Sequence, residues 1–331
     1  MGRVTTERFG PYRIDNTAPD GTITGNPTSW TNQNATLTFN ATDTGGSGVR
    51  RVRIAGGTWV NGSTTTQTAA ANGTYSFEVE DHAGNTRTVS ANVTRIDNTA
   101  PDGTITGNPI AWQNTNATLT FNATDTGGSG VRRVRIAGGT WVNGSTTTQI
   151  ATENGTYSFE VEDHAGNTRT VSATVNRIDK AVPSGSISQT PTGWTNQNVT
   201  LTFNVTDTGG SGVRRVRQSG GTWVNGSTTT QTVTSNGTYS FEVEDHAGNT
   251  STRSHTVTNI DKILPNASST QSPTAWTNGN VDITWNASAT GSPLSRIRTH
   301  NGSTWGAWSA VSGTTSSTVQ TVTSNGIVLR K

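Results

Sequence analysis

A repeat of 82 residues constrains what this chain can fold into more than any other feature of its sequence. The aspartate that ends Arg13-Ile14-Asp15 recurs as Asp97, Asp179 and Asp261, always 82 residues after its predecessor. A unit of this length is too long for one turn of a solenoid and suits a complete small domain. We therefore expect an orphan N-terminal strand, three complete repeats and one divergent, incomplete repeat, with the bounds 1–15, 16–97, 98–179, 180–261 and 262–331.

Within each repeat the apolar residues alternate with polar ones. Leu37, Phe39 and Ala41 show this alternation, and so do Phe77 and Val79. A period of two is the pattern of strands with one buried face. Gly, Asn, Asp and Pro interrupt these short segments about every 8–12 residues, which is typical of a β-sandwich. The sequence thus predicts an all-β fold of tandem β-sandwich domains in an extended rod.

Four motifs give the repeats a family likeness. They are Asp-Asn-Thr-Ala-Pro, Thr-Asp-x-x-x-Ser-Gly-Val, Asn-Gly-Thr-Tyr-Ser-Phe-Glu-Val and Asp-His-Ala-Gly-Asn. A chain with this set resembles bacterial immunoglobulin-like domain repeats, which occur in surface adhesins, in filaments, beside secreted enzymes and in phage structural proteins. The resemblance covers essentially the whole chain and implies immunoglobulin-like sandwiches. It implies a spacer or a binding module and no single activity, because such folds host many functions.

The composition argues against several kinds of function. The net charge is only +2 over 331 residues, so no nucleic-acid partner is expected. The absence of cysteine removes disulfides, thiolate chemistry and Cys-based zinc sites. No apolar run reaches the about 18–20 residues of a membrane-spanning helix. With the resemblance, this predicts an extracellular or cell-surface protein, and the lack of a signal-peptide pattern in residues 1–15 keeps a virion location as the alternative.

Aspartates at three positions of the repeat are the candidate metal ligands. The resemblance implies that the linker into a domain and its B–C and F–G loops meet at one pole, which places three carboxylates together. With loop carbonyls they supply the roughly six to eight oxygens that calcium prefers. The alternative, that each aspartate only caps a turn through its own side chain, stays open. Calcium is expected at Asp15, Asp43, Asp81, Asp97, Asp125, Asp163, Asp179, Asp207 and Asp245, and not in the fourth repeat, which has Ala289 at the B–C position.

Two further motifs predict structure and not chemistry. Arg50, Arg51 and Arg53 lie on a strand that an immunoglobulin-like sheet places beside Glu78 and Glu80, so cross-strand ion pairs are predicted in place of an anion-binding stripe. The Asp-His pair of the Asp-His-Ala-Gly-Asn turn is copied three times, whereas a hydrolytic triad needs one oriented constellation in a pocket. We therefore expect no enzyme, no catalytic residue and no cofactor besides calcium.

The two ends of the sequence have the register of one divided domain. Residues 4–15 align with 86–97, the last strand of a repeat, while the fourth repeat stops within its sixth strand. Either both ends are boundaries of a fragment of a longer chain, or the chain assembles by donor-strand complementation, in which the N-terminal strand of one copy completes the C-terminal domain of the next. Such a head-to-tail contact does not close and therefore produces a fibre. The residues assigned to this assembly are Val4, Phe9, Tyr12, Ile327, Val328 and Leu329.

The function predicted from these features is a structural one, an extracellular stalk or filament subunit that associates with itself head-to-tail. Near-identical repeats let the length change without altering any surface, which suits a spacer and not a catalyst. One alternative is a surface adhesin whose cell-surface or glycan ligand binds the divergent fourth repeat with its extra tryptophans, Trp305 and Trp308. The other alternative is a phage virion or tail appendage.

Overall fold

The computed structural model describes residues 3, 5–7, 10–300, 307–322 and 329–330, and every regular element among them is a β-strand. The all-β prediction is confirmed. In this part of the chain no helix is long and apolar enough to cross a membrane. The first repeat contains the strands β1 (Asp20–Thr24), β2 (Ala35–Thr42), β3 (Val49–Ile54), β4 (Val60–Asn61), β5 (Thr64–Ala69), β6 (Gly73–Asp81) and β7 (Thr86–Val93).

The next two repeats contain the same strands in the same order. In the second repeat they are β8 (Asp102–Thr106), β9 (Ala117–Thr124), β10 (Val131–Ile136), β11 (Val142–Asn143), β12 (Thr146–Ala151), β13 (Gly155–Asp163) and β14 (Thr168–Val175). In the third they are β15 (Ser184–Thr190), β16 (Val199–Thr206), β17 (Val213–Gln218), β18 (Val224–Asn225), β19 (Thr228–Val233), β20 (Gly237–Asp245) and β21 (Thr250–Val257).

Two antiparallel sheets make up each complete repeat. In the first repeat one sheet has the order β1-β2-β5 and the other the order β4-β3-β6-β7, and the second and third repeats copy both. Buried and exposed residues alternate along the strands as predicted. In β2, Leu37 and Phe39 are fully buried, while Thr36, which precedes Leu37, is exposed. The predicted tandem sandwiches are therefore confirmed, and the extended rod stays a prediction.

A stacked pair of phenylalanines joins the two sheets. Phe39 of β2 and Phe77 of β6 are fully buried, and their ring centroids lie 5.3 Å apart. Val52 of β3 and Val79 of β6 complete this core with no exposed surface. The same pair recurs in the other complete repeats at 5.3 and 5.4 Å, as Phe121 with Phe159 and Phe203 with Phe241. Aromatic pairs of this kind bury a large apolar area between the sheets of a chain that has no cysteine.

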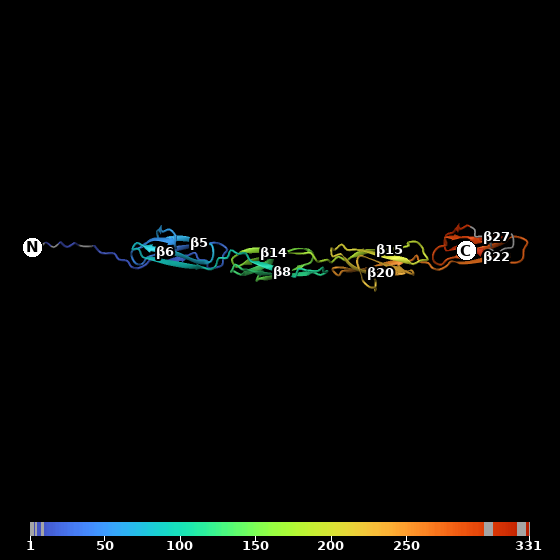
Figure 1. Cartoon of the computed structure of the whole chain (residues 1–331), viewed down its shortest axis with the longest axis horizontal. Helices are drawn as coiled ribbons and strands as arrows, with labels where there is room; N and C mark the ends of the chain where they lie inside the picture. Colours follow the sequence, from blue (N-terminus) through green and yellow to red (C-terminus); the bar gives the residue numbers. More distant parts are fainter. Residues whose placement is uncertain (1–2, 4, 8–9, 301–306, 323–328, 331) are drawn as a thin grey trace. The chain divides into compact units, whose positions relative to one another are not determined.

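The chain divides into two compact units. The first consists of Met1–Ile110 and Asn116–Ile178, and the second of Ala111–Thr115 and Asp179–Lys331. The first unit holds two of the phenylalanine cores and the second unit holds the third. Figure 1 marks strands of each sandwich, for example β5 and β6, and draws the segment ahead of β1 without a strand arrow.

The fourth repeat keeps one full sheet and departs in the other. Its three-stranded sheet has the order β22-β23-β27, like β1-β2-β5. Opposite it, the described residues form two short pairs, β24 with β26 and β25 with β28. The strands are β22 (Asn266–Ser272), β23 (Val281–Ser288), β24 (Arg296–Ile297), β25 (Thr299–His300), β26 (Ser309–Ala310), β27 (Thr315–Val322) and β28 (Leu329–Arg330).

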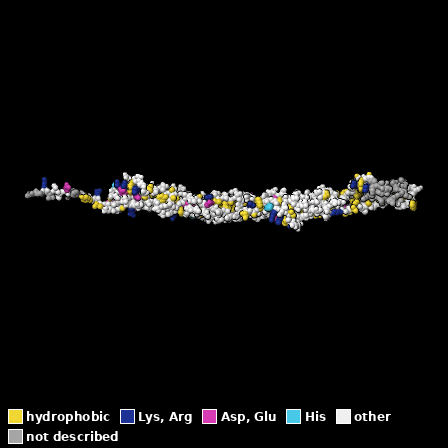
Figure 2. Space-filling model, in the orientation of Figure 1, with side chains coloured by type: hydrophobic (Ala, Val, Ile, Leu, Met, Phe, Trp, Pro, Cys, Tyr) yellow, Lys and Arg dark blue, Asp and Glu magenta, His cyan; other side chains and the backbone are white. Residues whose placement is uncertain are grey.

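The surface is polar but sparsely charged. Figure 2 shows that uncharged side chains and backbone cover most of the visible face, with the charged side chains in small separate groups. This matches the composition, in which only 13% of residues are charged. A broad electrostatic field that would attract a polyanion is therefore not expected on this face.

Replacing Phe39 by Ala tests the role of the stacked pair. We expect the free energy of unfolding of the first repeat to fall by about 3–5 kcal/mol, because the substitution leaves a cavity between the sheets. Val60→Ala is the matched control, since Val60 is 51% exposed and should change stability by less than about 0.5 kcal/mol. Calorimetry of the whole chain should show one transition lowered by Phe39→Ala. An unchanged thermogram would contradict the core assignment.

Candidate metal centre

Three carboxylates meet at one end of each complete repeat. In the second repeat they come from Asp97 in the linker between β7 and β8, Asp125 in the β9–β10 loop and Asp163 at the end of β13. One carboxylate oxygen from each lies within 4.8 Å of the others. The structure brings the predicted residues together in the same way in the remaining two clusters, which are Asp15 with Asp43 and Asp81, and Asp179 with Asp207 and Asp245.

The carboxylate at the end of the sixth strand is buried and held by one asparagine. Asp163 is fully buried, and its two oxygens accept hydrogen bonds from the backbone N–H of Asn167 at 2.8 Å and from its Nδ2 at 2.7 Å. The same Nδ2 donates to the carbonyl oxygen of Asp97 at 2.8 Å. At the equivalent Asp81, burial works to raise the pKa, but the hydrogen bonds from Asn85, Ser47 and Ala83 together outweigh it and the net pKa is lowered.

The linker aspartate is bound on both sides. Its Oδ1 accepts a hydrogen bond from the N–H of Thr99 at 3.0 Å, and its Oδ2 accepts one from the N–H of Ser129 at 2.9 Å. The N–H of Asp97 itself donates to the carbonyl of Thr31 at 2.9 Å. Burial works to raise the pKa of Asp97, yet the hydrogen bonds from Ser129 and Thr99 lower it overall. The linker therefore carries a carboxylate that stays ionised although only 3% of the residue is exposed.

The loop aspartate organises its own turn. Asp125 accepts hydrogen bonds from the N–H of Gly127 at 3.0 Å and from the N–H of Gly130 at 2.7 Å. This is the turn-capping role that the sequence left open, and it exists alongside the clustering. Gly127 has a second reason to be glycine, because a Cβ there would overlap Oδ1 of Asp97. The sequence pattern gave no signal for this close approach or for the bridging amide of Asn167.

In the fourth repeat the linker aspartate makes its hydrogen bonds without the other two carboxylates of the cluster. Asp261 accepts hydrogen bonds from the N–H of Ser292 at 2.6 Å and from its hydroxyl at 2.7 Å. The N–H of Asp261 donates to Thr195 at 2.8 Å, as the N–H of Asp97 does to Thr31. The backbone hydrogen bond from Ser292 is the largest cause that lowers the pKa of Asp261. Linker attachment therefore does not depend on the other two aspartates.

The donor set of the three clusters fits a hard cation. Carboxylate oxygens are the ligands that calcium prefers, and each oxygen that accepts one N–H bond retains a further lone pair. The N–H donors described above use one lone pair of these oxygens, and the hydroxyl of Ser129 lies among the carboxylates, 3.5 Å from Oδ2 of Asp125. The single carboxylate of Asp261 does not fit. Calcium at the three clusters stays a prediction.

The arginine clusters are ion-paired, as predicted. Arg51 Nε donates to Glu80 at 2.9 Å, Arg50 Nη1 also donates to Glu80 at 2.8 Å, and Arg53 pairs with Glu78. The sequence reasoning missed Trp59, whose ring lies 4.7 Å from the Arg51 guanidinium carbon and 4.3 Å from that of Arg53. This Trp–Arg packing recurs around Trp141, Trp223 and Trp308. It consolidates a sheet face and is no free anion site.

The residues predicted for assembly are only partly described. Tyr12 is 81% exposed and belongs to no strand. Leu329 belongs to β28 and is paired with His300 of β25. The remaining ones, Val4, Phe9, Ile327 and Val328, lie outside the described residues.

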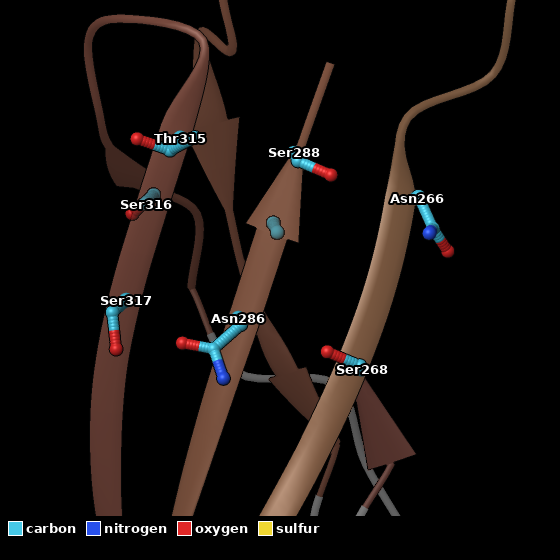
Figure 3. Close-up of a pocket in the computed structure, with 8 residues that line it drawn as sticks. Asn266, Ser268, Asn286, Ser288, Thr315, Ser316 and Ser317 are labelled. Atoms are coloured by element: carbon cyan, nitrogen blue, oxygen red, sulfur yellow. The ribbon is translucent and has the colours of Figure 1, made fainter.

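A polar hollow of about 300 Å³ lies on the sheet face of the fourth repeat that is opposite Trp285. Figure 3 shows Asn286 on the middle strand, with Ser268 and Ser317 on the strands to either side. Hydroxyl and amide side chains and Ala287 line it, without a charged group. The equivalent row of the first repeat carries threonine where these serines stand; that row is Thr22, Asn40 and Thr64.

Parts of the chain are similar in sequence to known proteins. Residues 60–98 match the profile of a family described as bacterial Ig-like domain. Exoglucanase B of Cellulomonas fimi is 31% identical over 175 residues. That match takes in 47% of this chain but only 16% of exoglucanase B, so the chain corresponds to a small part of that protein.

Two solved structures of Escherichia coli alpha-2-macroglobulin are similar at a much lower level. The native form is 10% identical with a TM-score of 0.19, over 93% of this chain and 27% of that one. The form activated by porcine elastase is 11% identical with a TM-score of 0.20, over 95% and 41%. Scores of this size carry no argument about fold or function.

Acid titration tests the role of Asp97. Its pKa is lowered in the folded chain, so its contribution to stability is complete above the unfolded pKa of about 3.9 and is lost as the pH falls through the lower folded value. We expect stability against urea to decrease below about pH 4. Asp97→Asn should be less stable at pH 7 and lose less on acidification. Parallel pH profiles for both proteins would contradict this role.

Replacing Gly127 by Ala tests the close approach of the loop to the linker. The added Cβ must displace the Asp97 carboxylate, which we expect to cost about 1–3 kcal/mol. Gly155→Ala is the matched control, because no atom lies within 4 Å of a Cβ at that position. Urea unfolding of the two variants and the parent chain provides the comparison. Equal effects of both substitutions would refute the steric argument.

Calcium titration tests the cation hypothesis. We expect three bound ions per chain and a higher unfolding temperature, because the ion joins three carboxylates in the folded state only. Asp43→Ala should remove one ion, whereas Ser292→Ala in the fourth repeat should remove none. Isothermal titration calorimetry gives the stoichiometry. Unfolding temperatures that do not respond to calcium or to chelator would exclude the hypothesis.

Proposed function

This chain carries bacterial Ig-like domains in tandem, and from that premise we propose that it is a non-catalytic structural segment of an extracellular protein, a stalk or filament subunit. Domains of this family belong to bacterial surface and secreted proteins, which supports an extracellular location. The observation that carries the proposal is the junction chemistry. The same hydrogen bond, from a serine N–H to the linker aspartate, recurs at Asp15, Asp97, Asp179 and Asp261.

A repeated junction favours a load-bearing or spacing role. Each linker aspartate is fixed to a loop of the repeat that follows, and three of the four are also fixed through their N–H to the repeat before. Such contacts restrict the motion of the linker, whereas a flexible linker lets neighbouring domains move independently. The recurrence of this connection at Asp97, Asp179 and Asp261 favours a spacing role.

The polar groups that resemble a catalytic pair have structural partners. Both oxygens of Asp81 accept hydrogen bonds from Asn85, and His82 is exposed in the turn that follows β6. A hydrolytic triad needs the acid to orient the base and the base to contact a nucleophile. This geometry supports a role in shaping the turn and favours the non-catalytic proposal.

Electron microscopy of the purified chain tests the filament form of this proposal. We expect polymers that lengthen with protein concentration, because a head-to-tail contact does not close on itself. Particles of one subunit at every concentration would contradict the filament and leave a monomeric stalk. The finer prediction of donor-strand complementation involves Val4 and Phe9, which lie outside the described residues.

The hollow in the fourth repeat favours ligand binding as a second function. Its hydroxyl and amide groups both donate and accept hydrogen bonds and carry no charge, which suits a neutral sugar. Trp276 of this repeat, which is 98% exposed, offers further binding surface. Of the two tryptophans predicted for this role, Trp308 packs against Arg296 and Arg298, and Trp305 lies outside the described residues.

A glycan array probed with the whole chain tests this second function. A specific signal that is lost in Asn286→Ala would support an adhesin. Asn204→Ala is the matched control, since Asn204 occupies the equivalent position of the third repeat. The absence of any glycan signal, or equal loss in both variants, would rule out recognition in the hollow.

A further inference from the structure

A network of neutral side chains holds the linker between the third and fourth repeats. Asn259 is only 8% exposed, and its Nδ2 donates to the carbonyl oxygens of Pro191 at 3.1 Å and Gly193 at 2.5 Å. Its Oδ1 accepts a hydrogen bond from Nε2 of Gln189 at 3.1 Å. Oε1 of Gln189 in turn lies 2.7 Å from Nε2 of His255. A chain of hydrogen bonds therefore runs from β21 through the end of β15 to the linker.

The direction of this hydrogen-bond chain is fixed by the backbone at its end. Carbonyl oxygens only accept hydrogen bonds, so Asn259 must turn its NH2 group to them and its oxygen to Gln189. Gln189 then presents its own oxygen to His255, and the imidazole must donate through Nε2. Both the imidazolium and the neutral ring with its proton on Nε2 can do so. A neutral ring with its proton on Nδ1 cannot.

The first two repeats have other residues at the three positions of this network. At the position of Gln189 they have glycine, and a Cβ on Gly25 would overlap the carbonyl oxygen of Thr36. The third repeat runs differently here, since β15 has seven residues where β1 has five. The equivalents are Gly25 and Gly107 for Gln189, Ala91 and Ala173 for His255, and Arg95 and Arg177 for Asn259.

The network adjoins the two backbone hydrogen bonds that attach the linker to the third repeat. The N–H of Thr195 donates to the carbonyl of Asn259 at 2.9 Å, and the N–H of Asp261 donates back to the carbonyl of Thr195 at 2.8 Å. The first repeat has the same two bonds, but there the exposed Arg95 replaces the buried asparagine and donates to the carbonyl of Thr28 at 2.6 Å. The third repeat therefore fixes its linker from the inside.

The junction with this network differs from the others on its far side as well. In the loop of the fourth repeat Ala289 stands where the other repeats have an aspartate. This loop is also one residue shorter, because the linker aspartate and the serine that binds it lie 31 residues apart, against 32 in the second repeat. At the first junction the longer loop meets Trp30, whose Cη2 lies 3.8 Å from the position of a Cβ on Gly128. The network thus occurs where the following loop has lost its carboxylate.

We propose that His255, Gln189 and Asn259 are positioning residues that clamp the linker into the fourth repeat onto the third repeat without a metal ion. The chain then has two kinds of junction. Where three carboxylates gather, the attachment can be reinforced by a cation, whereas the attachment ahead of the fourth repeat comes from neutral side chains and is indifferent to calcium. The clamp goes beyond the stalk function and does not depend on it.

Amide hydrogen exchange of the whole chain in chelator tests the clamp. Gln189→Ala leaves the buried oxygen of Asn259 without its donor, so we expect the N–H groups of Thr195 and Asp261 to exchange about tenfold faster. Gln197→Ala is the matched control, because this exposed glutamine follows the same threonine and its amide donates only to its neighbour in sequence. It should leave both exchange rates unchanged.

Substitutions at position 255 separate the hydrogen bond from simple packing. His255→Ala introduces the residue of the first two repeats and should accelerate exchange as Gln189→Ala does. His255→Gln should restore slow exchange, because a glutamine amide can donate to the same oxygen. The N–H groups of Thr31 and Asp97, which make the same backbone bonds in the first repeat, are the internal reference and should not change.

Nitrogen NMR of the histidine rings in the parent chain gives a second readout that needs no variant. At alkaline pH we expect the proton of His255 on Nε2, and a proton on Nδ1 would overturn the clamp. Unchanged exchange in Gln189→Ala, or equal acceleration in Gln197→Ala, would overturn it too. Acceleration that extends to Thr31 and Asp97 would do the same, because the effect would then not be local. Each of these results leaves the stalk function standing, since electron microscopy tests that function separately.

Discussion

The linker aspartate is the interaction on which the order of the repeats depends. Its carboxylate accepts N–H groups from the linker and from a loop of the repeat that follows, and its own N–H binds the repeat before it, as Asp97 does with Ser129 and Thr31. One residue thus belongs to two domains at once. Gly127 is glycine so that the loop can reach this carboxylate, and Asn167 ties the linker carbonyl to the end of β13.

Hydrogen bonds attach the linker to the repeats, and the attachment does not require a cation. Asp261 keeps the serine contact although Ala289 replaces the loop aspartate, so the attachment works with one carboxylate. Three carboxylates in one place are tolerated in the other repeats because N–H donors surround them, and these donors hold the pKa of Asp97 and Asp179 below the usual range against the effect of burial. A calcium ion would add stiffness to a connection that already exists.

The fold was largely predictable from the sequence and the site only in part. Leu37 and Phe39 alternate with polar residues, and this pattern identifies the buried face of the strand. The same alternation on neighbouring strands puts Arg51 and Glu80 on one face, where they pair. Contacts across a junction follow no such local period. Nothing in the sequence pattern says that Trp30 covers Gly128 or that Trp59 packs on two arginines, because these depend on how loops meet in space.

Amide hydrogen exchange at Ser129 and Ser292 tests the central claim most directly, since both N–H groups donate to a linker aspartate, in repeats with and without the other two carboxylates. If the carboxylate itself holds the junction, both amides exchange slowly in the presence of a chelator, and calcium slows Ser129 alone. Rapid exchange of both amides in chelator, with protection of Ser129 only when calcium is added, would contradict the account and make the metal the primary connection.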